Sequence, residues 1–197
     1  FLMGVIIAFE TALVAQIFGA VIFVVNGIGI AMTRELGPLM TAILFAGRSG
    51  SAFAAQLGTQ KVNEELNALT TFGLSPMYFL VVPRLIASSL VVPLLSVFAT
   101  ILGILGGGLV MAMYDITYTQ FYVQLLKSVT VTDIVFGLVK AVIFGFVIAL
   151  IGCQCGMNTG AGAAAVGSST TKSVVKSIIW IVVIDGAAAL LTNRLGI

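Results

Sequence analysis

Three long stretches without a charged residue limit what this chain can fold into. They contain 23 residues from 11 to 33, 30 residues from 85 to 114 and 31 residues from 141 to 171. A membrane-spanning helix needs about 20 consecutive apolar residues, and only 8% of the residues are charged, against about 25% in a soluble domain. The sequence therefore predicts an all-α integral membrane protein. Because no long polar insert interrupts it, residues 1–197 are expected to form a single transmembrane domain.

The hydrophobic pattern predicts a bundle of about five membrane-spanning helices. The expected spans are residues 1–18, 20–57, 77–113, 134–155 and 174–195. The chain begins at Phe1 inside an apolar run without the charged segment of a signal peptide, so we expect it to start within its first helix.

Two features interrupt this pattern. Pro38 lies inside the long second span, and because proline has no backbone N–H, we expect a kink or break there. Residues 156–171 are rich in Gly, Ala, Ser and Thr, a composition that predicts a flexible loop.

The composition argues against several kinds of chemistry. The chain has no histidine, which excludes imidazole catalysis, Ser/His/Asp triads and His-ligated metals. Cys153 and Cys155 lie in an apolar segment without a paired CxxC pattern, so we interpret them as small packing residues. A net charge of +2 is too small to indicate nucleic-acid binding. We predict no catalytic residue and no metal site.

The longest polar stretch, residues 58–76, predicts a short amphipathic helix between two spans. Its apolar residues follow helical i, i+4, i+7 spacing, with Thr59 as the expected N-cap, Gly73 just beyond the end and Pro76 preventing continuation. The apolar stripe and the neighbouring charged residues are Val62, Leu66 and Leu69 with Lys61, Glu64 and Glu65.

The arginines and lysines near this helix predict that it lies on the cytoplasmic side. Arg48 and Arg84 flank the segment, and Lys172 and Lys176 follow the connection two spans later, on the same face. A helix lying on lipid headgroups is one interpretation. Two adjacent glutamates disfavour anionic lipid, and no aromatic anchor precedes Phe72, so binding to a protein partner is favoured.

An ordered series of motifs resembles the signature of the MlaE/YrbE family of permease subunits. The densest similarity covers about residues 34–95 and weaker similarity continues through most of the chain. The motifs are Arg34-Glu35-Leu36-Gly37-Pro38, Ala46-Gly47-Arg48-Ser49-Gly50-Ser51-Ala52, residues 57–69 and Val82-Pro83-Arg84.

This resemblance implies a homodimeric permease with five spans per subunit, preceded in full-length members by an interfacial helix that this chain would lack. Its partners would be two cytoplasmic ABC ATPase subunits and an MCE-domain lipid-binding protein. The implied cargo is phospholipid or a related lipid, and the implied location is the bacterial inner membrane. The helix at 59–72 would be the coupling helix that docks on the ATPase. No GxxxxGK[ST] loop occurs in the sequence, so ATP and Mg are expected to bind the partner ATPase.

Charged residues inside the spans are candidates for a lipid pathway, because an ionisable group at membrane depth is costly and usually faces a cavity or a partner. Arg34 and Glu35 precede the Gly37-Pro38 pair, and Lys140 and Asp185 lie in the last two spans. The resemblance places charged residues matching Glu35, Lys140 and Asp185 around a lipid cavity. An equally weighted interpretation is a structural ion pair between Lys140 and Asp185.

Apolar side chains for the acyl chains are expected on the first helix and around Pro38. The candidates are Phe1, Leu2, Val5 and Phe9, with Ile28, Met32 and Leu36. The alternative, that any of these faces membrane lipid or packs against another helix, is at least as well supported by the sequence.

Two other functions remain open at this point. An ion channel or secondary transporter without an ATPase also uses broken helices and buried charges, but it has no need for a docking helix. An intramembrane enzyme would have only scattered carboxylates for its chemistry. A co-purifying ATPase distinguishes the permease from both.

Overall fold

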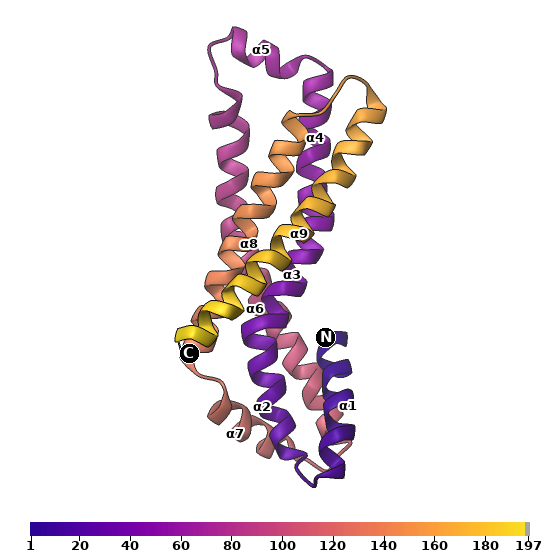
Figure 1. Ribbon diagram of the computed structural model, residues 1–197, viewed down its shortest axis with the longest axis vertical. Coiled ribbons are helices and arrows are strands. Elements are labelled where there is room, and N and C mark those ends of the chain that lie inside the picture. The colour runs from indigo at the N-terminus through magenta and orange to yellow at the C-terminus, as the bar shows by residue number, and fades with distance from the viewer. Residues whose placement is uncertain (196–197) are drawn as a thin grey trace. The chain divides into compact units, whose positions relative to one another are not determined.

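The computed structural model describes residues 1–195, which fold as helices joined by short connections (Figure 1). Two compact units are formed: residues 1–40 with 94–139, and residues 41–93 with the described residues from 140 onward. The helices are α1 (Leu2–Ile17), α2 (Ile22–Ala31), η1 (Met32–Leu36), α3 (Gly37–Phe45), η2 (Ala46–Gly50), α4 (Ser51–Val62), α5 (Glu65–Thr71), η3 (Met77–Val81), α6 (Val82–Ala112), α7 (Tyr118–Ser128), α8 (Val131–Met157) and α9 (Ala163–Leu195).

Among the described residues, four helical runs are long and apolar enough to cross a membrane. They are Ile22–Val62, Met77–Ala112, Val131–Met157 and Ala163–Thr192. The predicted all-α polytopic membrane architecture is therefore confirmed. The first expected span is the apolar helix α1, whose 16 residues fall below the roughly 20 that a perpendicular crossing needs.

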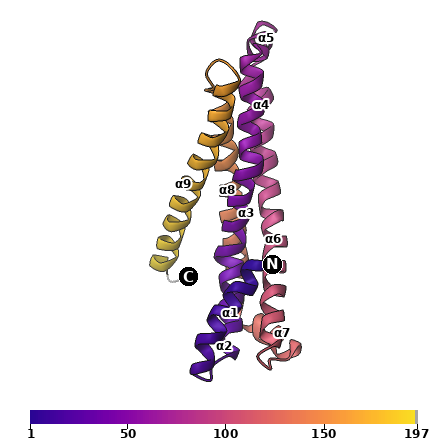
Figure 2. The same cartoon turned by 90° about the vertical axis from the view of Figure 1, so that its right-hand side faces the viewer.

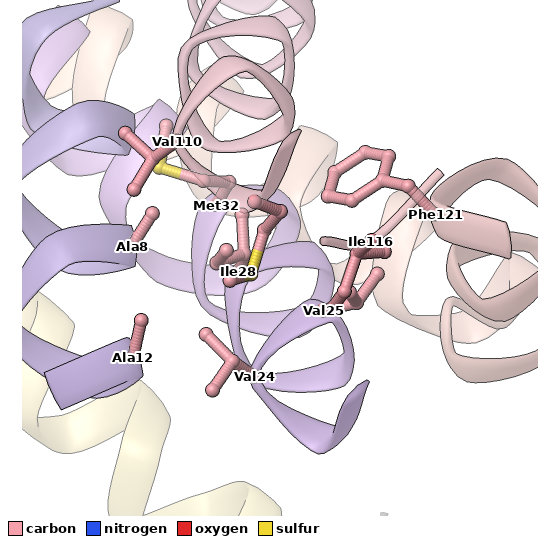
Figure 3. Packing of buried hydrophobic residues seen from close by; sticks show 10 residues of the cluster. Ala8, Ala12, Val24, Val25, Ile28, Met32, Val110, Ile116 and Phe121 are labelled. Atoms are coloured by element: carbon pink, nitrogen blue, oxygen red, sulfur yellow. The ribbon is translucent and has the colours of Figure 1, made fainter. Parts of the chain in front are cut away.

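The first unit has a core in which small residues of α1 pack against branched residues of α2 (Figure 3). Ala8 and Ala12 lie beside Val24 and Ile28, and Phe121 of α7 closes another side. Ile28 and Met32 are buried, with exposed fractions of 0% and 3%. These two residues were considered for a lipid cavity, but the structure places them in this packed core, so the packing alternative holds for them.

Of the kink or break expected at Pro38, the break is absent. The helix continues through the π-helical turn η1, in which the Gly37 N–H bonds to the carbonyl oxygen of Met32. Thr100 of α6 donates a second hydrogen bond to that oxygen, at 3.3 Å. A Cβ on Gly37 would lie 2.1 Å from the Thr100 hydroxyl oxygen. The wide turn thus accommodates the proline without ending the helix.

The predicted flexible loop at 156–171 is mostly helical. α8 extends to Met157 and α9 begins at Ala163, which leaves only residues 158–162 as the turn between them (Figure 2). Gly162 has a positive φ of 87°, the conformation that glycine adopts most easily. Hydroxyl groups in the next turns donate to backbone carbonyls, as Thr170 does to Gly167. Tertiary packing of α9 overrides the weak helix propensity of Gly, Ser and Thr.

Both cysteines pack as small residues, as expected. Cys153 and Cys155 are free thiols, and both are buried, with exposed fractions of 1% and 8%. Cys153 packs with Leu57 and Val81, and Cys155 packs with Ala54.

Candidate functional site

The first charged pair lies in the first unit, where η1 meets the start of α8. Arg34 Nη1 lies 3.2 Å from Asp133 Oδ1, and the Arg34 guanidinium also lies 5.3 Å from the ring centre of Phe136. The other carboxylate oxygen of Asp133 accepts hydrogen bonds from the N–H and hydroxyl of Thr130, at 2.9 and 2.7 Å. The side chains of Arg34 and Asp133 are only 19% and 9% exposed. Both carboxylate oxygens of Asp133 therefore accept hydrogen bonds, one from Arg34 and the other from Thr130.

Asp133 is a functional candidate that was not selected from the sequence, because it lies just before the expected span at residues 134–155. A local signal was present, because Thr130-Val131-Thr132-Asp133 matches the [ST]xx[DE] capping box before an apolar run. Asp133 N also donates to the Thr130 hydroxyl at 3.4 Å, which completes the box. Its pairing with Arg34, 99 residues away, had no local signal.

The second charged pair lies in the second unit and joins α8 to α9. Lys140 Nζ lies 2.6 Å from Asp185 Oδ1, and the lysine side chain is only 2% exposed. The structural ion pair that the sequence analysis considered for these residues is thus present. Such a pair can fix the register of two membrane helices, and its presence leaves a role in lipid binding as a prediction.

Glu35 follows Arg34 within the π-helical turn η1 and is partly buried. The turn adds one residue to the helical repeat, so it sets which face of the helix each of these two side chains occupies. Glu35 and Arg34 belong to the first unit, whereas Lys140 and Asp185 belong to the second.

The apolar candidates of α1 differ in their surroundings. Phe1 lines an apolar cavity of about 340 Å³ together with residues of α6 and α7, such as Leu105 and Phe121. Phe9 contacts Tyr114 edge-to-face, with ring centres 6.3 Å apart. Leu2 is 72% exposed, and Val5 is half-buried against the core.

A second apolar cavity of about 290 Å³ in the first unit was not foreseen. Its lining residues are Thr33, Pro38, Ser96, Val97, Thr100, Ile101, Ile104, Leu125, Leu126, Val129, Ile134, Gly137 and Leu138. The hydroxyls of Thr33 and Thr100 donate to the backbone carbonyls of Gly29 and Met32, at 2.7 and 3.3 Å. These hydroxyls are already satisfied, so the cavity suits an apolar ligand such as an acyl chain.

The amphipathic helix α7 on one side of this cavity was also missed. A capping box between Thr117 and Gln120 starts it, and the sequence Thr117-Tyr-Thr-Gln120 carries that signal. Gln124 then donates to Asn26 of α2 at 2.8 Å, which holds α7 in the first unit.

The expected coupling helix is divided into two pieces. Thr59 lies within α4 and is not an N-cap, because α4 continues to Val62 and a turn separates it from α5 (Figure 1). Glu64 has a positive φ of 62° in that turn, and its carboxylate accepts a hydrogen bond from Asn67. Local side-chain bonding of this kind competes with a continuous helix.

The end of α5 agrees with the sequence prediction. Gly73 has a φ of 77°, and the N–H of Leu74 bonds to the carbonyl of Leu69 at 3.0 Å while the Gly73 N–H bonds to Thr70 at 3.0 Å. This pair of bonds is the Schellman arrangement, which favours glycine just beyond a helix.

The apolar stripe of this segment is partly covered by the chain itself. Leu66 is only 8% exposed, whereas Phe72 beyond the helix is 81% exposed. Val62 and Leu69 are half-buried, and Lys61, Glu64 and Glu65 are exposed. The most exposed apolar side chain in this connection is therefore Phe72, which was not among the residues selected from the sequence.

Comparison with known proteins adds relatives over nearly the whole chain. A probable ABC transporter permease protein of Synechocystis sp. is 38% identical over 179 residues, 90% of this chain and 68% of the relative. One of Rickettsia typhi is 35% identical over 185 residues, 93% of this chain and 71% of the relative. The chloroplastic protein trigalactosyldiacylglycerol 1 of Arabidopsis thaliana is 38% identical over 159 residues, 80% of this chain and 45% of the relative.

The family model described as Permease MlaE matches residues 1–191. This match covers both units and the four membrane-spanning helical runs. The chain is an integral membrane permease that belongs to the MlaE permease family.

Proposed function

We propose that this chain is the permease subunit of an ABC transporter that moves phospholipid or a related lipid between the bacterial inner membrane and an MCE-domain partner. Three findings support the proposal: the family match, the permease names of the bacterial relatives, and the lipid in the name of the Arabidopsis relative. ATP hydrolysis would reside in a separate subunit.

The observation that carries the lipid proposal is the apolar cavity of about 290 Å³ beside η1. Thr33 lines it, and the next residue, Arg34, forms the buried ion pair with Asp133. An apolar cavity next to charged groups suits a lipid, because the cavity can accept an acyl chain and the charged groups can interact with a polar headgroup.

The proposed assembly is a homodimer with two ABC ATPase subunits on its cytoplasmic side. The connection from Lys61 to Phe72 is the proposed contact with the ATPase, because it combines exposed charges with one exposed aromatic residue. Closure of the ATPase dimer would be transmitted through this connection to α4 and α6.

Transport by the reconstituted complex tests this function. Proteoliposomes containing the permease and its co-purified ATPase should transfer fluorescent phospholipid to an MCE-domain acceptor, and transfer should require ATP. A non-hydrolysable ATP analogue is the control. Ion flux that needs no ATPase, without lipid transfer, would instead identify a channel or secondary transporter.

Phe72→Asp should release the ATPase while leaving the permease folded. Phe72 is 81% exposed, so the free permease loses little packing, whereas an aromatic anchor at an interface contributes about 2 kcal/mol or more, roughly 30-fold in affinity. A detergent pull-down measures the retained ATPase, and Phe72→Leu, which stays apolar, is the matched control. Normal retention by Phe72→Asp would remove this residue from the interface.

Glu35→Gln should slow lipid transfer without preventing assembly. The change keeps the shape of this partly buried side chain and removes its charge. Hydrogen bonds to charged groups contribute about 1.5–3 kcal/mol, so transfer should fall by roughly tenfold or more. Glu35→Asp, which keeps the charge, is the control. Transfer at the wild-type rate in Glu35→Gln would show that the charge is dispensable.

A further inference from the structure

A polar pocket lies in the helical hairpin that α8 and α9 form in the second unit. Its volume is about 210 Å³, and its lining residues are Gln154, Cys155, Asn158, Ser169, Lys172 and Lys176. Residues 158–162 form the turn that joins the two helices (Figure 2). The pocket is unlike the two apolar cavities of the first unit, since most of its lining side chains are polar.

Helical spacing explains how these groups converge. Gln154 lies in the last turn of α8, and Asn158 follows the end of that helix, where its N–H still bonds to the Gln154 carbonyl at 3.1 Å. Lys172 and Lys176 are four residues apart on α9, so they lie on one face of that helix. Ser173, adjacent to Lys172, is fully buried and donates to the carbonyl of Gly50 at 3.3 Å. This contact fixes the rotation of α9 and leaves both lysines beside α8.

The charge of the pocket is unbalanced. It contains two ammonium groups, two amides and a hydroxyl, and the lining residues that the structure describes include no carboxylate. The Arg34–Asp133 and Lys140–Asp185 ion pairs lie outside this pocket. Two like charges one helical turn apart repel each other, and an anion between them would relieve that repulsion.

The length of α9 allows this pocket to lie at the membrane surface. The apolar run Ala163–Thr192 has 30 residues, about 45 Å at 1.5 Å per residue, which is longer than the roughly 30 Å of hydrocarbon. Trp180 follows Lys176 by four residues on the same face and is 54% exposed. A tryptophan one turn from one lysine and two turns from another is typical of the headgroup region. Lys176 lies nine residues from Asp185, roughly 13 Å along the helix.

We propose that this pocket binds a phosphate group, presented by a phospholipid headgroup at the surface of the membrane. Ammonium groups attract the phosphate charge, and the amide and hydroxyl groups of Gln154, Asn158 and Ser169 donate to its oxygens. The site is separate from the Lys140–Asp185 pair and does not depend on the proposed transport function. The lipid bound in this pocket stabilises the cytoplasmic end of the α8–α9 hairpin.

Binding of two matched lipids to the full-length permease in maltoside micelles tests the proposal. Dioleoylphosphatidic acid and dioleoylglycerol have the same chains and differ in the phosphate. We expect native mass spectrometry to detect tighter binding of the phosphatidic acid. Each ammonium group near an anionic lipid contributes about fivefold, so Lys172→Gln with Lys176→Gln should weaken its binding by roughly 25-fold.

Three further variants separate the pocket from general effects. Lys127→Gln removes an exposed lysine of α7, and the affinity for phosphatidic acid should stay within about twofold of the wild-type value. Replacing Lys172 and Lys176 by arginine should preserve most of this affinity, because the positive charge remains. In a Cys153→Ala background, phosphatidic acid should slow alkylation of Cys155, which lines the pocket.

Competition with inorganic phosphate identifies the source of the ligand. Displacement of phosphatidic acid only by other phospholipids supports the lipid headgroup, and displacement by millimolar inorganic phosphate supports a phosphate site open to soluble ligands. Equal binding of the two lipids, unchanged binding by the double glutamine variant, or an equal loss in Lys127→Gln would overturn the proposal.

Discussion

Asp185→Ala is expected to destabilise the permease by about 3–5 kcal/mol, because it removes one partner of a buried ion pair and takes its counter-charge from the ammonium group of Lys140. Lys140 is only 2% exposed, and its Nζ lies 2.6 Å from the Asp185 carboxylate. For a chain of this length such a loss lowers the unfolding midpoint by on the order of 10 °C. Thermal unfolding in detergent, followed by the fluorescence of the single tryptophan, measures the shift.

The double variant Lys140→Met with Asp185→Leu is the matched control. Replacing a buried ion pair by apolar residues of similar size is often neutral for stability, so the double variant should unfold at close to the wild-type midpoint. Its rate of lipid transfer then distinguishes a structural role of the ion pair from a role in the lipid pathway. Normal transfer would indicate a purely structural pair, and lost transfer in a stable protein would indicate a role in the lipid pathway. A stable Asp185→Ala variant would contradict the pairing itself.

Gly152→Val should be a strongly damaging change at a helix contact in the second unit. A Cβ at Gly152 would lie 2.7 Å from the carbonyl oxygen of Gly50 and 3.3 Å from Phe53 Cβ. Backbone must therefore move, and overpacking of this kind costs about 1–3 kcal/mol or more. The displacement also disturbs the hydrogen bond from Ser173 to Gly50. The unfolding midpoint and the fraction of monodisperse protein measure the effect.

Gly186→Ala is the control for this prediction, since an added Cβ there meets nothing within 4 Å. Alanine in an open helical position is favoured over glycine by roughly 0.5–1 kcal/mol, so the midpoint should stay or rise slightly. Equal midpoints for Gly152→Val and the wild type would show that α8 does not pack closely on η2.

The sequence by itself determined the class of the protein and a few local features. Helices long enough to span a membrane follow from uncharged stretches of 23 to 31 residues, because backbone groups in lipid must bond within their own helix. The helix end at Gly73 was also predictable, since glycine adopts its φ of 77° without strain. The Lys140–Asp185 pair was one of two equally weighted interpretations of the sequence, because an ionisable group inside an apolar span needs a partner or a cavity.

Tertiary structure decided the features that depend on contacts between distant residues. Arg34 pairs with Asp133 across 99 residues, and the hydroxyl of Thr100 supports the π-helical turn that replaces the expected break. Leu66, which belongs to the apolar stripe predicted to dock on a partner, is buried within the chain, whereas Phe72 is exposed. The convergence of Lys172 and Lys176 with Gln154 and Asn158 required the short α8–α9 turn. Sequence periodicity assigns a residue to a face of its helix, but only the packing of neighbouring helices decides what that face contacts.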